Sequence, residues 1–165
     1  MFAVRDKVVH PQHGAGTIIG FKDDVLKGFG RYYVIDLAAY ERIVMIPIDG
    51  ADDIGLRQVS APTVLTSVFE TLTASPTLLP GNYTERQANI GERLKTGDII
   101  EVAGVVRDLA WHSRYKKLTT VDSSLFDQAR KFLASELALV QDIDVDEAMG
   151  WVDCTLNECW AQTLE

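Results

Sequence analysis

The hydrophobic periodicity of the chain changes once, near Val59 and Ser60, and this change limits the possible folds more than any other feature of the sequence. Before it, short runs rich in β-branched and aromatic residues are separated by turn-forming Gly, Pro and Asp. After it, apolar residues recur at the three- and four-residue spacing of amphipathic helices. The chain has 165 residues, enough for two small units, so the sequence predicts an α+β protein with domains 1–59 and 60–165.

The first domain contains strand-like runs at Thr17–Phe21, Arg31–Leu37 and Arg42–Ile48, with turn signals such as Asp49-Gly50 between or after them. Four or five short strands with tight turns in so few residues predict a small SH3- or Tudor-like β-barrel. The run Arg42–Ile48 has no charged residue in its interior, so as an edge strand it would be open to pairing with another chain.

The second domain has five helix-like segments joined by short connections, and these predict a compact five-helix bundle. The segments cover residues 60–72, 82–94, 99–115, 120–140 and 144–160. Asn82 or Thr84 is expected to cap the second of these helices, and Thr120 or Asp122 the fourth.

Charge is distributed unevenly between these segments, although the formal net charge is -8. Residues 132–165 hold eight acidic residues and no Lys or Arg, whereas residues 60–131 hold nine basic and eight acidic residues. The acidic excess therefore lies at the C-terminal end, and the middle of the chain can still present a local basic face.

Tyr83 stands at the start of the helix predicted over 82–94, and Arg86, Arg93 and Lys95 follow it. An aromatic side chain at such a position can unstack or prop a nucleic acid, and basic neighbours can hold phosphates. Packing of Tyr83 into a corner between helix and loop is the alternative, and acidic neighbours on the same helix weaken the nucleic-acid interpretation.

Motifs of catalysis are absent from the sequence. His10 and His13 have a spacing that metal sites use, but no third ligand is fixed beside them. No nucleophile elbow or phosphate-binding loop occurs, so we expect no enzymatic activity, no metal and no cofactor. Cys154 and Cys159 are five residues apart in a helix-like stretch, which favours neither a disulfide nor a shared metal.

No apolar run is long enough to span a bilayer, and the N-terminus does not resemble a signal peptide. We therefore expect a cytoplasmic protein without membrane contact. A monomer is favoured, although an exposed strand edge could pair with a second copy.

Several short motifs follow one another in order along both predicted domains. In the first domain these are V-R-D-K-V-V-H-P-Q-H-G-A-G from Val4 to Gly16, then G-R-Y-Y-V-I-D-L, V-M-I-P-I and I-G-L-R. In the second they are N-Y-T-E-R, R-L-K-T-G-D, V-A-G-V-V-R-D-L and A-R-K-F-L-A-S-E-L-A. Each motif is short, but their order and spacing over nearly the whole chain resemble those of the CarD family of bacterial transcription regulators.

The resemblance implies that the N-terminal Tudor-like domain docks on the RNA polymerase β subunit by strand-edge pairing. The matching residues here are Ile43, Val44, Met45, Ile46 and Pro47. It also implies that the helical domain reaches promoter DNA at the upstream edge of the bubble, where a Trp typically wedges into the minor groove. Tyr83 occupies that position, and Asp24 and Met45 stand where some members carry polymerase-facing Arg.

The main hypothesis is thus a regulator that docks on polymerase and stabilises the promoter open complex, with Tyr83 as wedge and Arg86, Arg93 and Lys95 on phosphates. A polymerase- or protein-binding adaptor without significant DNA contact is the alternative, favoured by the acidic C-terminal segment and the few basic residues around Tyr83. A metal protein or enzyme using His10 and His13 is the third.

Overall fold

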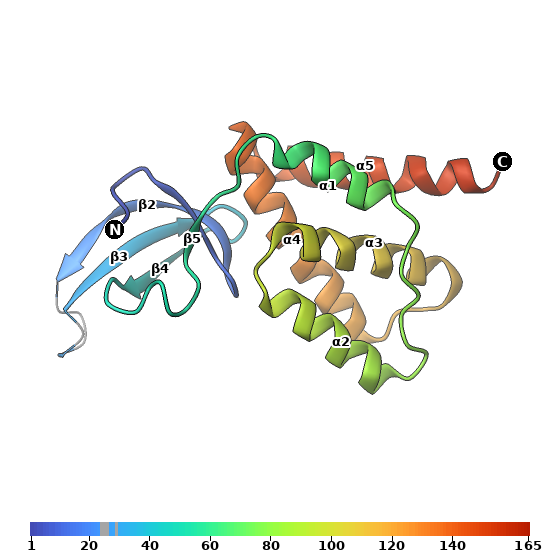
Figure 1. Cartoon of the computed structure of the whole chain (residues 1–165), viewed down its shortest axis with the longest axis horizontal. Coiled ribbons are helices and arrows are strands. Elements are labelled where there is room, and N and C mark those ends of the chain that lie inside the picture. Colours follow the sequence, from blue (N-terminus) through green and yellow to red (C-terminus); the bar gives the residue numbers. More distant parts are fainter. Residues whose placement is uncertain (24–26, 29) are drawn as a thin grey trace.

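The computed structural model of the protein describes residues 1–23, 27–28 and 30–165, so the expectation concerning Asp24 lies outside the described residues. A β-sheet lies at one end of the molecule and a group of helices at the other (Figure 1). The chain passes once from sheet to helices, as the change in periodicity predicts, and the α+β class is confirmed.

All five strands of the sheet pair in antiparallel fashion, in the order β4-β3-β2-β1-β5. Their bounds are β1 (Lys7–His10), β2 (Gly14–Asp23), β3 (Arg31–Leu37), β4 (Arg42–Pro47) and β5 (Arg57–Gln58). Gly16 lets β2 and β3 approach closely, because a Cβ at this position would lie 2.6 Å from the carbonyl oxygen of Asp36. The register shifts between Ile18 and Gly20, which is a bulge in β2.

The sheet does not close into the predicted barrel. Among the described residues, the two outer strands β4 and β5 pair only with their inner neighbours β3 and β1. β5 has only two residues, both paired with β1, so it is too short to bridge back to β4. Residues 48–56 instead form turns, from which Ala51 and Leu56 enter the core of the sheet.

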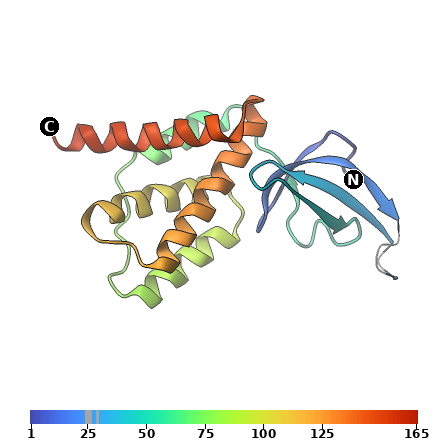
Figure 2. The same ribbon diagram turned by 180° about the vertical axis from the view of Figure 1, so that it is seen from behind.

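Five helices follow the sheet, close to the segments that the periodicity predicts. They are α1 (Val64–Thr73), α2 (Tyr83–Lys95), α3 (Ile99–Tyr115), α4 (Thr120–Gln141) and α5 (Val145–Thr163). α3 contacts each of the other four helices, and its residues from Val102 to Leu109 are all buried. α5 runs beside α1, while α4 crosses behind α3 (Figures 1 and 2).

The C-terminal half of α4 packs against the sheet and joins the two parts. The backbone N–H of Ala15 donates to Ser135 Oγ at 3.0 Å, and Ala15 belongs to the same apolar core as the helices. Glu136, which is fully buried, accepts from both terminal nitrogens of Arg57 at 2.8 Å each. It also accepts from the backbone N–H and the hydroxyl of Ser60. These bonds fix the end of β5 and the start of the connection to α1.

α1 begins at Val64 and not at Ser60, because the polar groups of Ser60 are already bonded to Glu136. Of the helices in the described part of the chain, none is long and apolar enough to cross a membrane.

Candidate functional site

β4 is an outer strand of the sheet, and within the described residues only β3 pairs with it. Its side chains alternate between the two faces, as strand geometry requires. Ile43 is 58% and Met45 42% exposed, whereas Ile46 is buried and Val44 packs against the core of the sheet. The five residues predicted for polymerase binding thus lie together, but their exposed apolar surface comes mainly from Ile43 and Met45.

Tyr83 is the first residue of α2 and its side chain stands out from the surface, with 62% of the residue exposed. The carboxamide oxygen of Asn82 accepts from the N–H groups of Thr84 at 2.9 Å and Glu85 at 3.2 Å, which confirms Asn82 as the N-cap. The cap fixes the direction of the first turn of α2, and with it the position of the Tyr83 ring.

Arg86 lies beneath Tyr83 and is only 5% exposed. Its guanidinium donates to both carboxylate oxygens of Asp122, at 2.7 and 3.2 Å, and to the carbonyl oxygens of Pro80 and Gly81, at 3.1 Å each. The sequence suggests Arg86 as a phosphate ligand, but in the structure its donors are taken up inside the protein. Arg86 holds the loop before Tyr83 against the start of α4.

Asp122 lies at the third helical position of α4. We call its ion pair with Arg86 the Arg86–Asp122 latch. Its carboxylate accepts from the backbone N–H of Thr119, and the Thr119 hydroxyl accepts from the N–H of Asp122, which completes a capping box. The N-cap of α4 is therefore Thr119, and the prediction of Thr120 or Asp122 was wrong. Burial alone would raise the pKa of Asp122, but the hydrogen bonds from Arg86 and Thr119 outweigh it and lower the pKa to about 2. Asp122 is therefore a charged partner of Arg86 at neutral pH.

Arg93 and Lys95 lie at the other end of α2. Arg93 pairs with the buried carboxylate of Asp108 at 2.8 Å and packs over Gly104, where a Cβ would lie 2.7 Å from its Nη2. The side chain of Lys95 is 73% exposed and makes an ion pair with Glu92 on the surface. α2 has 13 residues, so Tyr83 and Lys95 are ~18 Å apart along its axis. The four predicted DNA-contacting residues share a helix without converging on one point.

Two exposed cations near the start of α2 were missed from the sequence. Lys116 and Lys117 lie in the connection between α3 and α4, and both are exposed. The pKa of His112 is lowered by burial and then by the charge of Arg86, while Asp122 raises it and Lys116 lowers it further. Lys116 and His112 line one pocket together with Gly81, two residues before Tyr83. The adjacent lysines at 116–117 were a visible signal, but only the fold shows which helix they approach.

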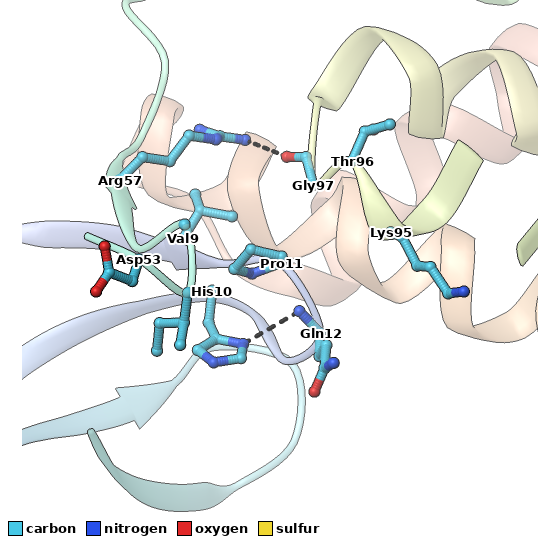
Figure 3. A pocket seen from close by; sticks show the side chains of 11 residues that line it. Val9, His10, Pro11, Gln12, Asp53, Arg57, Lys95, Thr96 and Gly97 are labelled. Carbon is cyan, nitrogen blue, oxygen red and sulfur yellow. Dashed lines mark hydrogen bonds between the residues drawn. The ribbon is translucent and has the colours of Figure 1, made fainter. Parts of the chain in front are cut away.

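The rings of His10 and His13 lie against each other at the turn between β1 and β2, tilted by 35° and with centroids 4.5 Å apart. His10 Nδ1 accepts from the N–H of Gln12 (Figure 3). The pKa of His10 is lowered by burial and by His13, so its neutral form is favoured. Within residues 1–23, 27–28 and 30–165, no three His, Cys, Asp or Glu side chains are grouped so that they could hold a metal ion.

A cavity of about 460 Å³ separates this turn from the end of α2. Figure 3 shows Asp53, Arg57 and Lys95 around it, with Arg57 donating to the carbonyl oxygen of Gly97 at 2.8 Å. Arg57 thus links β5 both to the α2–α3 corner and to Glu136 on α4.

Comparison with known proteins bears on both parts of the molecule. Residues 2–60 match the family model described as CarD-like/TRCF RID domain, and residues 67–153 match the model described as CarD, C-terminal domain. The chain belongs to the CarD family. It is also 33% identical, over 146 residues, to the Bacillus subtilis (strain 168) protein named "Putative transcription factor YdeB". That alignment covers 87% of this chain and 94% of the relative.

CarD-like families are associated with transcription, so the chain is placed among transcription-associated proteins rather than with a known enzyme class. Both matched regions lie on the units that the structure separates, the sheet and the helices. The boundary at Val59 and Ser60 stays a prediction.

Proposed function

We propose that this CarD-family protein docks on the β subunit of RNA polymerase through β4, and that it stabilises the promoter open complex by placing Tyr83 at the upstream edge of the DNA bubble. The observation that carries the DNA part is the exposed Tyr83 ring, 62% accessible, on a helix start held in place by Asn82 and Arg86. A rigid aromatic at this position can enter a minor groove and partly unstack a base step.

The polymerase part rests on the outer edge of β4, with which no strand of the described residues pairs. An unpaired edge presents backbone N–H and C=O groups in a row, and an incoming strand can add to it by β-augmentation. Ile43 and Met45 supply apolar surface beside that edge. Pairing would align the partner strand with β4, and the exposed apolar side chains would give the contact additional area.

The two surfaces belong to one structure, because Glu136 and Arg57 tie the sheet to α4 and α4 in turn holds Arg86. Docking through β4 would raise the effective concentration of Tyr83 at promoter DNA. A weak DNA contact is then sufficient. A weak contact agrees with the charges on α2. Of the predicted phosphate ligands in the described part of this helix, Lys95 is the one whose charged group is largely exposed.

The test is the lifetime of open complexes formed by purified polymerase and promoter DNA with the full-length protein. Loss of an aromatic–base contact costs ~1–3 kcal/mol, so Tyr83→Ala is expected to reduce the protein's effect on lifetime about fivefold or more. Tyr83→Trp should retain or increase the effect. Leu164→Ala, at an exposed position at the C-terminal end of α5, is the matched control. Equal lifetimes for wild type and Tyr83→Ala would rule out the wedge.

An adaptor that binds polymerase without touching DNA is the second candidate. The observation that favours it is that Arg86 and Arg93 are each paired with a buried carboxylate inside the protein. Two of the cations expected to bind phosphates are therefore already neutralised. DNA footprinting separates the two proposals. A change in protection near the upstream bubble edge supports the wedge, whereas polymerase binding with an unchanged footprint supports the adaptor.

A further inference from the structure

A second concave surface lies beside Tyr83, between residues 76–81 and the C-terminal end of α3. It is a pocket of about 340 Å³, within the range of small-molecule sites. The residues that line it and carry the argument are Leu78, Gly81, Trp111, His112, Tyr115 and Lys116. We call it the Leu78–Tyr115 pocket.

The walls of this pocket are unusual for a protein surface. Leu78 is 91% and Tyr115 73% exposed, the highest values among the large apolar side chains between residues 2 and 165 that the structure describes. Trp111 adds a second aromatic ring, which is held in an edge contact with Trp160 on α5, 4.9 Å between centroids. Two aromatic rings and an exposed leucine around one hollow are suited to a planar ligand.

The loop that forms one wall is held in place. The N–H of Thr77 donates to Asp108 Oδ1 at 2.9 Å, and the carbonyl oxygen of Gly81 accepts from Arg86. Leu78 is exposed on a segment that is bonded on both sides, so the hollow does not depend on an unanchored chain.

The charges around the pocket favour an anion. Lys116 lies at the rim, exposed, and Lys117 follows it. Asp108 also lines the pocket, but its carboxylate is paired with Arg93 and Arg107 and is fully buried. His112 has a lowered pKa, so at neutral pH its ring can both donate and accept a hydrogen bond.

The pocket is also close to the proposed wedge. Gly81, which lines it, is two residues before Tyr83, so their Cα atoms are at most about 7.6 Å apart. If Tyr83 inserts into a base step, the base that it unstacks would lie within reach of this pocket.

We propose that the Leu78–Tyr115 pocket binds a single unpaired nucleotide of promoter DNA. Its base would stack on Tyr115 against Leu78, and Lys116 would hold its phosphate. The proposal rests on the proposed DNA contact of Tyr83 and adds to it a receptor for the displaced base. Stacking on an aromatic ring tolerates every base, so the pocket needs no sequence preference.

Binding is tested directly with a single-stranded thymidine tetranucleotide and the full-length protein, followed by amide and indole NMR shifts. Saturable shifts at Leu78, Trp111 and Tyr115 are expected, and Tyr115→Ala should weaken the affinity about fivefold or more. Leu78→Ala and Lys116→Gln should also weaken it. Leu164→Ala and Lys22→Gln, at exposed positions on other elements, should not. The proposal is overturned if the NMR signals of the pocket residues do not shift, or if the substitutions in the pocket leave the affinity unchanged. The exposed surface would then be assigned to a protein partner.

Open-complex lifetimes measured with Tyr83→Ala and Tyr115→Ala connect the pocket to function. They also distinguish failure of the pocket proposal from failure of the proposed function. Shorter lifetimes with both Tyr83→Ala and Tyr115→Ala support the pocket as part of the DNA contact. A loss with Tyr83→Ala alone leaves the wedge standing and overturns the pocket. If the tetranucleotide binds but neither substitution affects lifetime, the proposed function fails, and with it the role of the pocket on promoter DNA.

Discussion

At the scale of single residues, the ion pair between Arg86 and Asp122 decides how Tyr83 is presented. Both side chains are almost completely buried, and Arg86 also holds two carbonyl oxygens of the preceding loop. The sequence shows Arg86 only as a cation near an aromatic residue, because its partner is 36 residues away. Its role as a support could not be predicted from local spacing.

Removing one member of a buried pair leaves the other charge without compensation, at a cost of about 3–5 kcal/mol. Asp122→Ala is therefore expected to lower the free energy of unfolding by roughly this amount. Urea denaturation followed by circular dichroism measures it. Asp127→Ala, which removes an exposed pair with Lys131 on the same helix, should cost about 0.5 kcal/mol or less. Equal effects of the two substitutions would contradict the latch.

Three groups with lowered pKa values, His10, His112 and Asp122, make the stability of the protein depend on pH below neutrality. His10 and His112 have lowered pKa values, so the unfolded state binds more protons than the folded state just below the ordinary value of 6.5. Stability should be fully present above that value and decline as the pH falls through it. Asp122 adds a further loss below 3.8, as the pH approaches its folded pKa of about 2. Thermal midpoints measured from pH 8 to pH 3 test this, and the double variant His10→Asn/His112→Asn should lack the first decline.

At the scale of elements, β4 is the feature that the sequence indicates best. The run Arg42–Ile48 has no internal charge, and the structure makes it an outer strand with a free edge among the described residues. The prediction of a closed barrel was wrong, because closure requires pairing between β4 and β5, the two outer strands of the sheet. A two-residue β5 cannot supply that pairing, and its length is not visible in the hydrophobic pattern.

A charge on the exposed face of β4 should disrupt docking without unfolding the sheet. Ile43→Glu is expected to weaken polymerase co-purification about tenfold or more, because a carboxylate would be desolvated at the interface. Ile19→Glu, at a similarly exposed position on the interior strand β2, is the control. Val44→Glu is less informative, since Val44 packs against the core of the sheet and its replacement would also destabilise the fold. Retained binding by Ile43→Glu would place the interface elsewhere.

At the scale of the whole molecule, Glu136 joins the surface expected to meet polymerase to the surface expected to meet DNA. Four hydrogen bonds reach its carboxylate, two from Arg57 and two from Ser60. The segment containing Glu136 is recognisable as helix from its sequence, but a buried carboxylate facing the sheet is a consequence of how α4 packs.

Glu136→Gln should lower stability and reduce the effect on open-complex lifetime. Polymerase affinity should stay unchanged, because Glu136 binds Arg57 of β5, at the opposite edge of the sheet from β4. The expected loss of stability is about 3 kcal/mol, as for a broken buried pair. Asp142→Asn removes the charge of the more exposed pair with Lys7 and should change little, because Asn tolerates the left-handed backbone of this position, φ 54°. Small-angle scattering of the free protein would show whether the sheet and the helices separate. An unchanged lifetime with Glu136→Gln would mean that this connection does not transmit docking to DNA.

The sequence by itself determined the α+β class, the order of the elements and most helix limits, including Ile99–Tyr115, and it narrowed the cap of α2 to Asn82 or Thr84. These features arise from interactions within a few residues, which periodicity and capping preferences record directly. Only the tertiary structure decided that the sheet stays open, that Arg86 is held by Asp122, and that Lys116 lines one pocket with Gly81. Each of these depends on residues far apart in the chain, whose meeting is set by packing rather than by local spacing.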